Sequence, residues 1–312
     1  MNPVQPPPPD PEPGVTWRAL ALQLFVLPAV IVAACVGVFL LFGSLTDEGK
    51  NAKHLLEEIR HADRGMPWDR NARWYAALEL PRRIAKERET LRRDPGFCRD
   101  LIGLFEDTRY PDPEMRAWMA IAMGKLGDPQ AIPVLVQGLS EEGEESKRIR
   151  YACAWALGAL QAHQAVPGLS ALLEDPLPPV RKMAAYALGA LGDPPALAAL
   201  WKALEDPVPE VRWTAAIWLG RRGDPAAAPT LSTLLDPKAA ASLPPAERET
   251  LLAQAAKAAG VLRDPALKPL VEALARDASP AVRMAAREAL ITYEHPERAA
   301  ALPAPAMPEP AP

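Results

Sequence analysis

The residue types that most often carry catalysis or hold metal ions are scarce in this chain. Its 312 residues include four histidines and three cysteines, which are His54, His61, His163, His295, Cys35, Cys98 and Cys153. None of them forms a Cys-x-x-Cys or His-x-x-x-His spacing, and no phosphate-binding glycine loop or Gly-x-Ser-x-Gly motif occurs. The sequence therefore predicts no catalytic residue, no metal ion and no cofactor, and hence a protein that is not an enzyme.

Arginine and aromatic residues, by contrast, recur at a regular spacing. An arginine follows an apolar residue at five equivalent places, which are Arg116, Arg150, Arg181, Arg212 and Arg283. Positions one and five after such an arginine share one side of a helix, and three consecutive units carry aromatic residues at or beside these positions. We call Tyr151, Trp155, Tyr186, Trp213 and Trp218 the aromatic stripe.

The aromatic stripe has two interpretations. Tryptophan and tyrosine are enriched at the energetic centres of protein interfaces, so the stripe is a candidate surface for a protein partner. The alternative is that the rings fill the core between repeats. Core packing is the preferred interpretation for Trp218.

The elements that position these residues are marked by a recurring turn. Residues 126–129 and 191–194 spell Leu-Gly-Asp-Pro, residues 222–225 spell Arg-Gly-Asp-Pro, and residues 262–265 spell Leu-Arg-Asp-Pro. Glycine suits the left-handed position that ends a helix, aspartate caps the next helix, and proline fits its first turn. The predicted caps of the repeats are therefore Asp128, Asp193, Asp224 and Asp264. Self-similarity at a period of about 30–40 residues predicts a solenoid of helix pairs.

Residues 206–225 carry the full pattern, Asp-Pro-x-Pro-x-Val-Arg-x-x-Ala-Ala-x-x-Leu-Gly-x-x-Gly-Asp-Pro. This pattern resembles the HEAT repeat superfamily, and in particular the short bacterial repeats first named for bilin lyases. The resemblance implies an all-α solenoid with six HEAT-like repeats over residues 96–294, after juxtamembrane and divergent capping helices over residues 46–95. It also implies that the five arginines form a structural ladder that reaches a turn aspartate or a carbonyl group of a neighbouring unit. A track for anions is the alternative.

Two repeats depart from the pattern. The fifth has Leu252 where an arginine is expected and an insertion around residues 239–247, and the second has an acidic turn at residues 141–145. Insertions in solenoids map to loops at one edge. These two are expected either to gate a partner or to be solvated loop tips.

Proline is in excess, with 37 residues. Many prolines punctuate the helix pairs, but residues 1–16 and 295–312 are proline-rich without apolar periodicity. Both ends are predicted to be flexible tails.

An uncharged apolar stretch covers residues 19–42. It is long enough for a transmembrane helix, which is predicted within residues 17–45. A cleavable signal peptide and a lipid-modified Cys35 are the alternatives. More basic residues follow the stretch than precede it, which favours a repeat domain in the cytoplasm rather than in the periplasm.

The sequence as a whole predicts a single-pass membrane protein in which one helix anchors a HEAT-repeat solenoid. The predicted function is a non-catalytic scaffold or adaptor that binds a protein partner at the membrane through its concave face. The alternative is a bilin-lyase-like enzyme whose solenoid handles a tetrapyrrole. The formal net charge of −4 disfavours nucleic acid as a partner.

Overall fold

The computed structural model describes residues 51–61, 67–107, 112–236, 239–241 and 243–301. These ranges contain fourteen α-helices and no strand. The α-helices are α3 (Ala52–His61), α4 (Pro67–Leu91), α5 (Pro95–Glu106), α6 (Pro113–Leu126), α7 (Ile132–Gly138), α8 (Lys147–Ala159), α9 (Val166–Ala171), α10 (Pro178–Leu191), α11 (Pro194–Ala203), α12 (Pro209–Arg221), α13 (Ala228–Leu235), α14 (Pro245–Leu262), α15 (Lys268–Leu274) and α16 (Pro280–Glu294). Short 3-10 helices are η2 (Pro129–Ala131), η3 (His163–Ala165), η4 (Leu172–Glu174), η5 (Pro225–Ala227) and η6 (Pro296–Ala301). This part of the chain is the all-α repeat solenoid that the sequence predicts.

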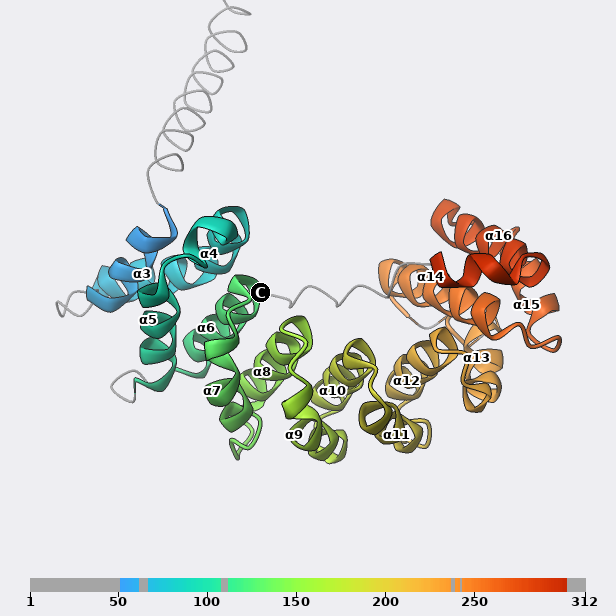
Figure 1. Ribbon diagram of the computed structural model, residues 1–312, viewed down its shortest axis with the longest axis horizontal. Coiled ribbons are helices and arrows are strands. Elements are labelled where there is room, and N and C mark those ends of the chain that lie inside the picture. Colours follow the sequence, from blue (N-terminus) through green and yellow to red (C-terminus); the bar gives the residue numbers. More distant parts are fainter. Residues whose placement is uncertain (1–50, 62–66, 108–111, 237–238, 242, 302–312) are drawn as a thin grey trace, which may run out of the picture. The chain divides into compact units, whose positions relative to one another are not determined.

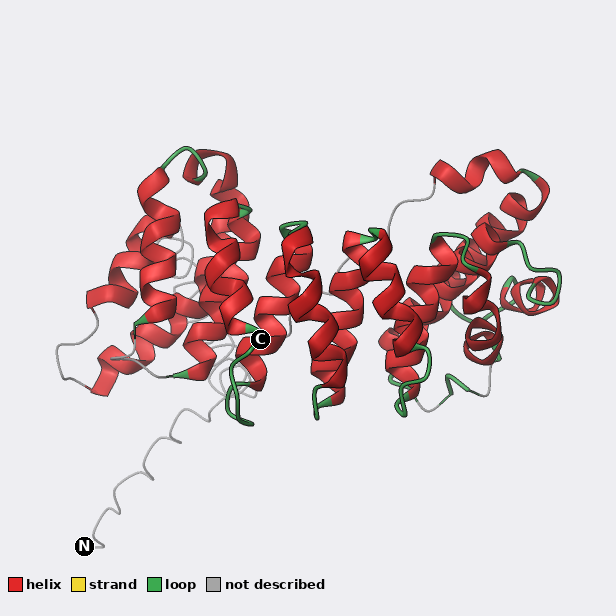
Figure 2. Cartoon of the chain, turned by 60° about the horizontal axis from the view of Figure 1, so that its bottom comes forward, coloured by secondary structure: helices red, strands yellow, loops and turns green. Residues whose placement is uncertain are grey.

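The helices form two layers. The even-numbered helices from α4 to α16 stack on one another in chain order, and each odd-numbered helix packs against the even-numbered helix that follows it. In Figure 1 the even-numbered helices from α6 to α14 lie on the inner side of a curved row, and the odd-numbered helices lie on the outer side. Figure 2 shows the short loops that join the two layers. We call the inner side the concave face.

Close packing within the inner layer depends on a glycine that recurs at one position of the repeat. A methyl group added at Gly124 would lie 2.8 Å from the ring of Trp155, and one added at Gly189 would lie 2.1 Å from the ring of Trp218. Both distances are far below the optimal separation of two carbon atoms, about 3.5–4.0 Å. The glycine of one repeat thus makes room for a ring of the next repeat.

The turns that end the inner helices use the left-handed backbone conformation. Gly127, Gly192 and Gly223 have φ angles of 76°, 63° and 77°. The two copies of the turn that lack glycine have Gln161 and Arg263 there, with φ angles of 53° and 54°. The aspartate that follows each glycine or Arg263 accepts a hydrogen bond from the backbone N–H two or three residues later, at 2.8–3.1 Å for Asp128, Asp193, Asp224 and Asp264.

Replacing Arg263 by glycine is expected to raise the free energy of unfolding by about 1 kcal/mol, because a left-handed conformation costs a residue with a Cβ atom roughly 1–2 kcal/mol and glycine little. Arg263 is exposed, so few contacts are lost. Urea denaturation followed by circular dichroism measures the change. The matched control is Gly223→Ala, whose added methyl group meets no atom within 4 Å and which is therefore expected to lose a similar amount. Equal stability of Arg263→Gly and the parent would contradict the argument.

The membrane prediction has a different outcome. None of the helices in the described part of the chain is both long and apolar enough to cross a membrane. The described residues therefore give no support to the predicted localisation as a single-pass membrane protein. The stretch at residues 19–42, on which that prediction depended, lies outside the described residues, as do the N-terminal tail and residues 302–312 of the C-terminal tail.

Part of the stretch predicted as a C-terminal tail is helical. Residues 296–301 form η6, which packs against α16. Proline is compatible with the first turn of a helix, so Pro296 does not prevent this.

Candidate binding groove on the concave face

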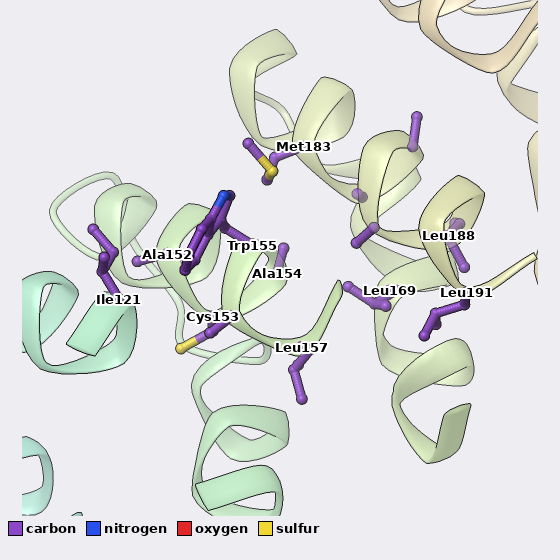
Figure 3. Packing of buried hydrophobic residues seen from close by; sticks show 14 of the residues in the cluster. Ile121, Ala152, Cys153, Ala154, Trp155, Leu157, Leu169, Met183, Leu188 and Leu191 are labelled. Atoms are coloured by element: carbon purple, nitrogen blue, oxygen red, sulfur yellow. The ribbon is translucent and has the colours of Figure 1, made fainter. Parts of the chain in front are cut away.

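The structure separates the aromatic stripe into two groups. Trp155, Trp213 and Trp218 are buried, with 5%, 5% and 2% of their surface exposed. Figure 3 shows Trp155 within the apolar cluster that includes Ile121 and Met183. These three tryptophans fill the space between repeats, whereas the two tyrosines of the stripe are only half-buried.

The two half-buried tyrosines line a groove on the concave face. Its volume is about 580 Å³. Its lining comes from four inner helices: Tyr151 from α8, Lys182 and Tyr186 from α10, Val211 from α12, and Glu247 from α14. Most of the remaining lining is apolar, including Met183, Val208, Leu251 and two prolines at the start of α10.

A small polar cluster crosses the groove. The Lys182 Nζ donates to the Glu247 Oε1 at 2.7 Å, which links α10 to α14 past the intervening α12. Tyr186 is linked to Thr214 by a side-chain hydrogen bond. Burial raises the pKa of Tyr186 and of Tyr151 above the ordinary value of tyrosine, so both phenols are neutral hydrogen-bond donors at pH 7. The groove therefore combines apolar walls with a few convergent polar groups.

The arginine ladder does not face the groove but joins neighbouring repeats. Arg181 donates from Nε and Nη2 to the carboxylate of Asp206 at 2.7 and 3.0 Å, and both side chains are buried. Arg150 makes the equivalent contact with Asp175 at 2.7 Å. Asp175 and Asp206 each lie in the loop between the two helices of the next repeat. In these two repeats the ladder is a set of buried ion pairs between units.

The other members of the ladder make related contacts. Arg116 pairs with Glu141 of the acidic turn and donates to a carbonyl oxygen of α5. Arg212 donates to the carbonyl oxygens of Asp206 and Pro207 at 2.6 and 3.0 Å. Arg283, in the last repeat, donates to two carbonyl oxygens of its own loop. None of the five arginines lines the groove among the described residues.

Sequence reasoning missed two features of the fifth repeat. Arg248, one helical turn before Leu252, supplies the missing ladder contact by donating to Asp277 at 2.8 Å. The insertion before it brings Ala246, Glu247 and Thr250 of α14 to the groove. The signal for both was the insertion around residues 239–247, since a longer N-terminal end of α14 shifts the arginine by one turn.

Metal sites are absent from the described residues, where no group of three or more metal-binding side chains comes together. Cys98 and Cys153 are buried and unpaired. Burial raises the pKa of the Cys98 thiol to about 12 and also raises that of Cys153, so neither is a thiolate at neutral pH.

Comparison with known proteins identifies the repeats. A family model described as HEAT repeats matches residues 101–177, 140–209 and 166–243 in three overlapping placements. The phycocyanobilin lyase subunit alpha of Synechococcus elongatus is 34% identical over 130 residues, which cover 42% of this chain and 45% of that protein. The match thus spans less than half the length of this curated relative.

Among solved structures, the complex of CpcE and CpcF of phycocyanin lyase from Nostoc sp. PCC7120 is similar in fold. The TM-score is 0.53 at 22% sequence identity, over 79% of this chain and 88% of that chain. At this identity the similarity concerns the solenoid fold alone.

The relative also corrects the prediction of a protein without enzymatic activity, because a lyase subunit is among the proteins to which this chain is related. The motifs whose absence led to that prediction belong to hydrolytic, phosphate and metal chemistry. A groove of tyrosines and one ion pair has no such motif, so the sequence did not reveal it. The described part of the chain is thus an α-solenoid in which residues 101–243 match HEAT repeats, and 130 residues of the chain are similar to a phycocyanobilin lyase subunit.

Proposed function

We propose that this chain is a lyase-type protein that holds a bilin, an open-chain tetrapyrrole, in the groove on its concave face. The observation that carries the proposal is the groove itself, which joins apolar walls, two half-buried tyrosines and one ion pair. Its volume of about 580 Å³ falls in the range typical of small-molecule sites, about 300–1,000 Å³. The 34% identity to a phycocyanobilin lyase subunit favours a bilin over other flat ligands.

The groove offers suitable contacts for such a ligand. Tyr151 and Tyr186 provide ring faces and neutral hydroxyl groups for the pyrrole rings and the polar edge of a bilin. The floor formed by Met183, Val208 and Val211 is apolar, and methionine adapts readily to an irregular ligand shape. Burial of a conjugated tetrapyrrole against these side chains is favourable through the hydrophobic effect.

The proposal includes a protein partner. The curated relative is named as one subunit of a lyase, and we infer that this chain likewise acts together with a second protein. The concave face outside the groove is available for that protein. Co-purification of a tagged full-length chain from its own cells, with and without added bilin, tests for the partner.

Mixing the purified chain with phycocyanobilin is expected to change the visible absorption and the fluorescence of the pigment, because binding fixes its conformation and removes water from it. Titration of the absorption gives the dissociation constant. An unchanged spectrum at pigment concentrations well above the protein concentration would overturn the proposal.

Replacing Tyr186 by leucine is expected to weaken phycocyanobilin binding about three- to tenfold, because an aromatic contact is worth roughly 0.5–1.5 kcal/mol beyond its buried area. The dissociation constant from the same titration measures the effect. The matched control is Tyr75→Leu, which removes an exposed tyrosine of α4 that does not line the groove. Equal weakening in the two variants would contradict the assignment of Tyr186 to the site.

A further inference from the structure

One ion pair in the groove differs from the ion pairs of the arginine ladder. Lys182 and Glu247 are 65 residues apart in the chain, and their side chains keep 30% and 37% of their surface exposed. The ladder pairs Arg150–Asp175 and Arg181–Asp206, in contrast, join adjacent repeats and are buried. The Lys182–Glu247 pair skips a repeat and lies on the wall of the groove.

Lys182 is the one basic side chain among the described residues that line the groove, and Glu210 and Glu247 are the acidic ones. The single cation of the groove is therefore paired with a carboxylate of the protein. A ligand with its own carboxylate would compete for the same ammonium group.

Replacing Glu247 by a ligand carboxylate as the partner of Lys182 costs the protein little free energy. Partly exposed ion pairs contribute only about 0–1 kcal/mol, so Lys182 can be released from Glu247 without destabilising the fold. Glu247 lies in the first turn of α14, where the helix dipole stabilises a negative charge. Glu247 therefore keeps a favourable environment after it loses Lys182.

We propose that Lys182 binds a carboxylate of the groove's ligand in place of Glu247, and that this exchange makes the groove select free-acid bilins over esterified ones. The inference rests on the proposed bilin site and assigns Lys182 as its specificity-determining residue. Glu247 acts as an internal competitor that occupies the ammonium group until the ligand arrives. No covalent step is involved.

The experiment compares phycocyanobilin, which carries two propionate groups, with its dimethyl ester, in which both charges are removed. Dissociation constants are measured by absorption titration for the parent chain, Lys182→Met, Glu247→Gln and Lys202→Met. Lys202 is an exposed lysine of the outer helix α11 and serves as the control. Urea denaturation of each variant reports separately on the fold.

The parent chain is expected to bind the free acid about tenfold more tightly than the ester, since a hydrogen bond to a charged group is worth about that factor. Lys182→Met is expected to abolish the preference by weakening only the binding of the acid. Glu247→Gln is expected to strengthen binding of the acid and leave that of the ester unchanged. Lys202→Met is expected to behave as the parent does.

Three results would overturn the inference while leaving the bilin site intact. They are equal binding of acid and ester by the parent, equal loss of both in Lys182→Met, and weaker binding of the acid in Glu247→Gln. Failure of the parent to bind either compound would overturn the bilin proposal itself. Binding of at least one of the two compounds by the parent therefore separates a failure of the Lys182 inference from a failure of the bilin proposal.

Discussion

Replacing Gly189 by alanine is expected to lower the free energy of unfolding by about 3 kcal/mol, the upper part of the usual range for an overpacked core. The new methyl group would lie 2.1 Å from Cγ of Trp218 and 2.3 Å from the next ring atom. Trp218 is almost completely buried, so its ring has no solvent-filled space to enter. The clash between the methyl group and the ring is relieved only if α10 and α12 move apart, which reduces the burial of the whole inner layer. Urea denaturation followed by circular dichroism measures the loss.

The matched control for this variant is Gly103→Ala. Gly103 is exposed within α5, and an added methyl group meets no atom within 4 Å. In a helix interior alanine is about 1 kcal/mol more favourable than glycine. The same substitution is therefore expected to stabilise the protein at residue 103 and to destabilise it at residue 189.

A second variant separates the steric argument from other effects of alanine. Trp218→Leu alone is expected to destabilise the protein through the volume it removes. Combined with Gly189→Ala, it is expected to cost less than the sum of the two single changes, because the smaller side chain leaves room for the methyl group. Strict additivity of the two changes would show that the contact with Trp218 is not the cause.

Much of the fold follows from short-range chemistry that the sequence displays. A glycine in the left-handed conformation, an aspartate that caps and a proline that tolerates the first turn mark the turns at residues 126–129, 191–194 and 222–225. The same signal is absent at Gln161 and Arg263, which adopt the left-handed conformation without being glycine. The position is imposed there by the stacking of neighbouring repeats, which local sequence does not encode.

The site was harder to predict than the fold. Helical spacing places Trp155, Tyr186 and Trp213 on related faces, but it does not tell how closely the next repeat approaches. That distance depends on the glycines of the inner helices, such as Gly124 beneath Trp155. The Lys182–Glu247 pair spans two repeats, so no periodic pattern contains it. In the sequence, Tyr151 and Tyr186 of the aromatic stripe and the insertion before α14 point to that region.

Replacing Arg181 by methionine is expected to cost about 3–5 kcal/mol of stability, because removal of one partner of a buried ion pair leaves the other charge uncompensated. Burial alone would raise the pKa of Asp206, yet the hydrogen bonds from Arg181 and the Val208 N–H and the charges of Arg181 and Arg212 hold that pKa below its ordinary value. The carboxylate therefore stabilises the fold at and above the unfolded pKa of about 3.9. This contribution is lost as the pH falls through the lower pKa of the folded state.

The stability difference between the parent and Arg181→Met, measured by urea denaturation, is thus expected to be fully present at pH 7. It is expected to shrink as the pH falls below the unfolded pKa of Asp206 and through its lower folded pKa, because the carboxyl group then becomes protonated in the folded and in the unfolded protein. The control is Arg283→Met, since Arg283 is not among the groups that act on Asp206 and donates to two carbonyl oxygens of its own loop. Its loss is expected to cost about 1 kcal/mol. Asp206→Asn in the Arg181→Met background removes the uncompensated charge while an amide oxygen can still accept from the Val208 N–H, which donates to Asp206 at 2.8 Å. This double variant is expected to recover most of the lost stability. A double variant no more stable than Arg181→Met would show that the packing of the arginine side chain, rather than its charge, holds neighbouring repeats together.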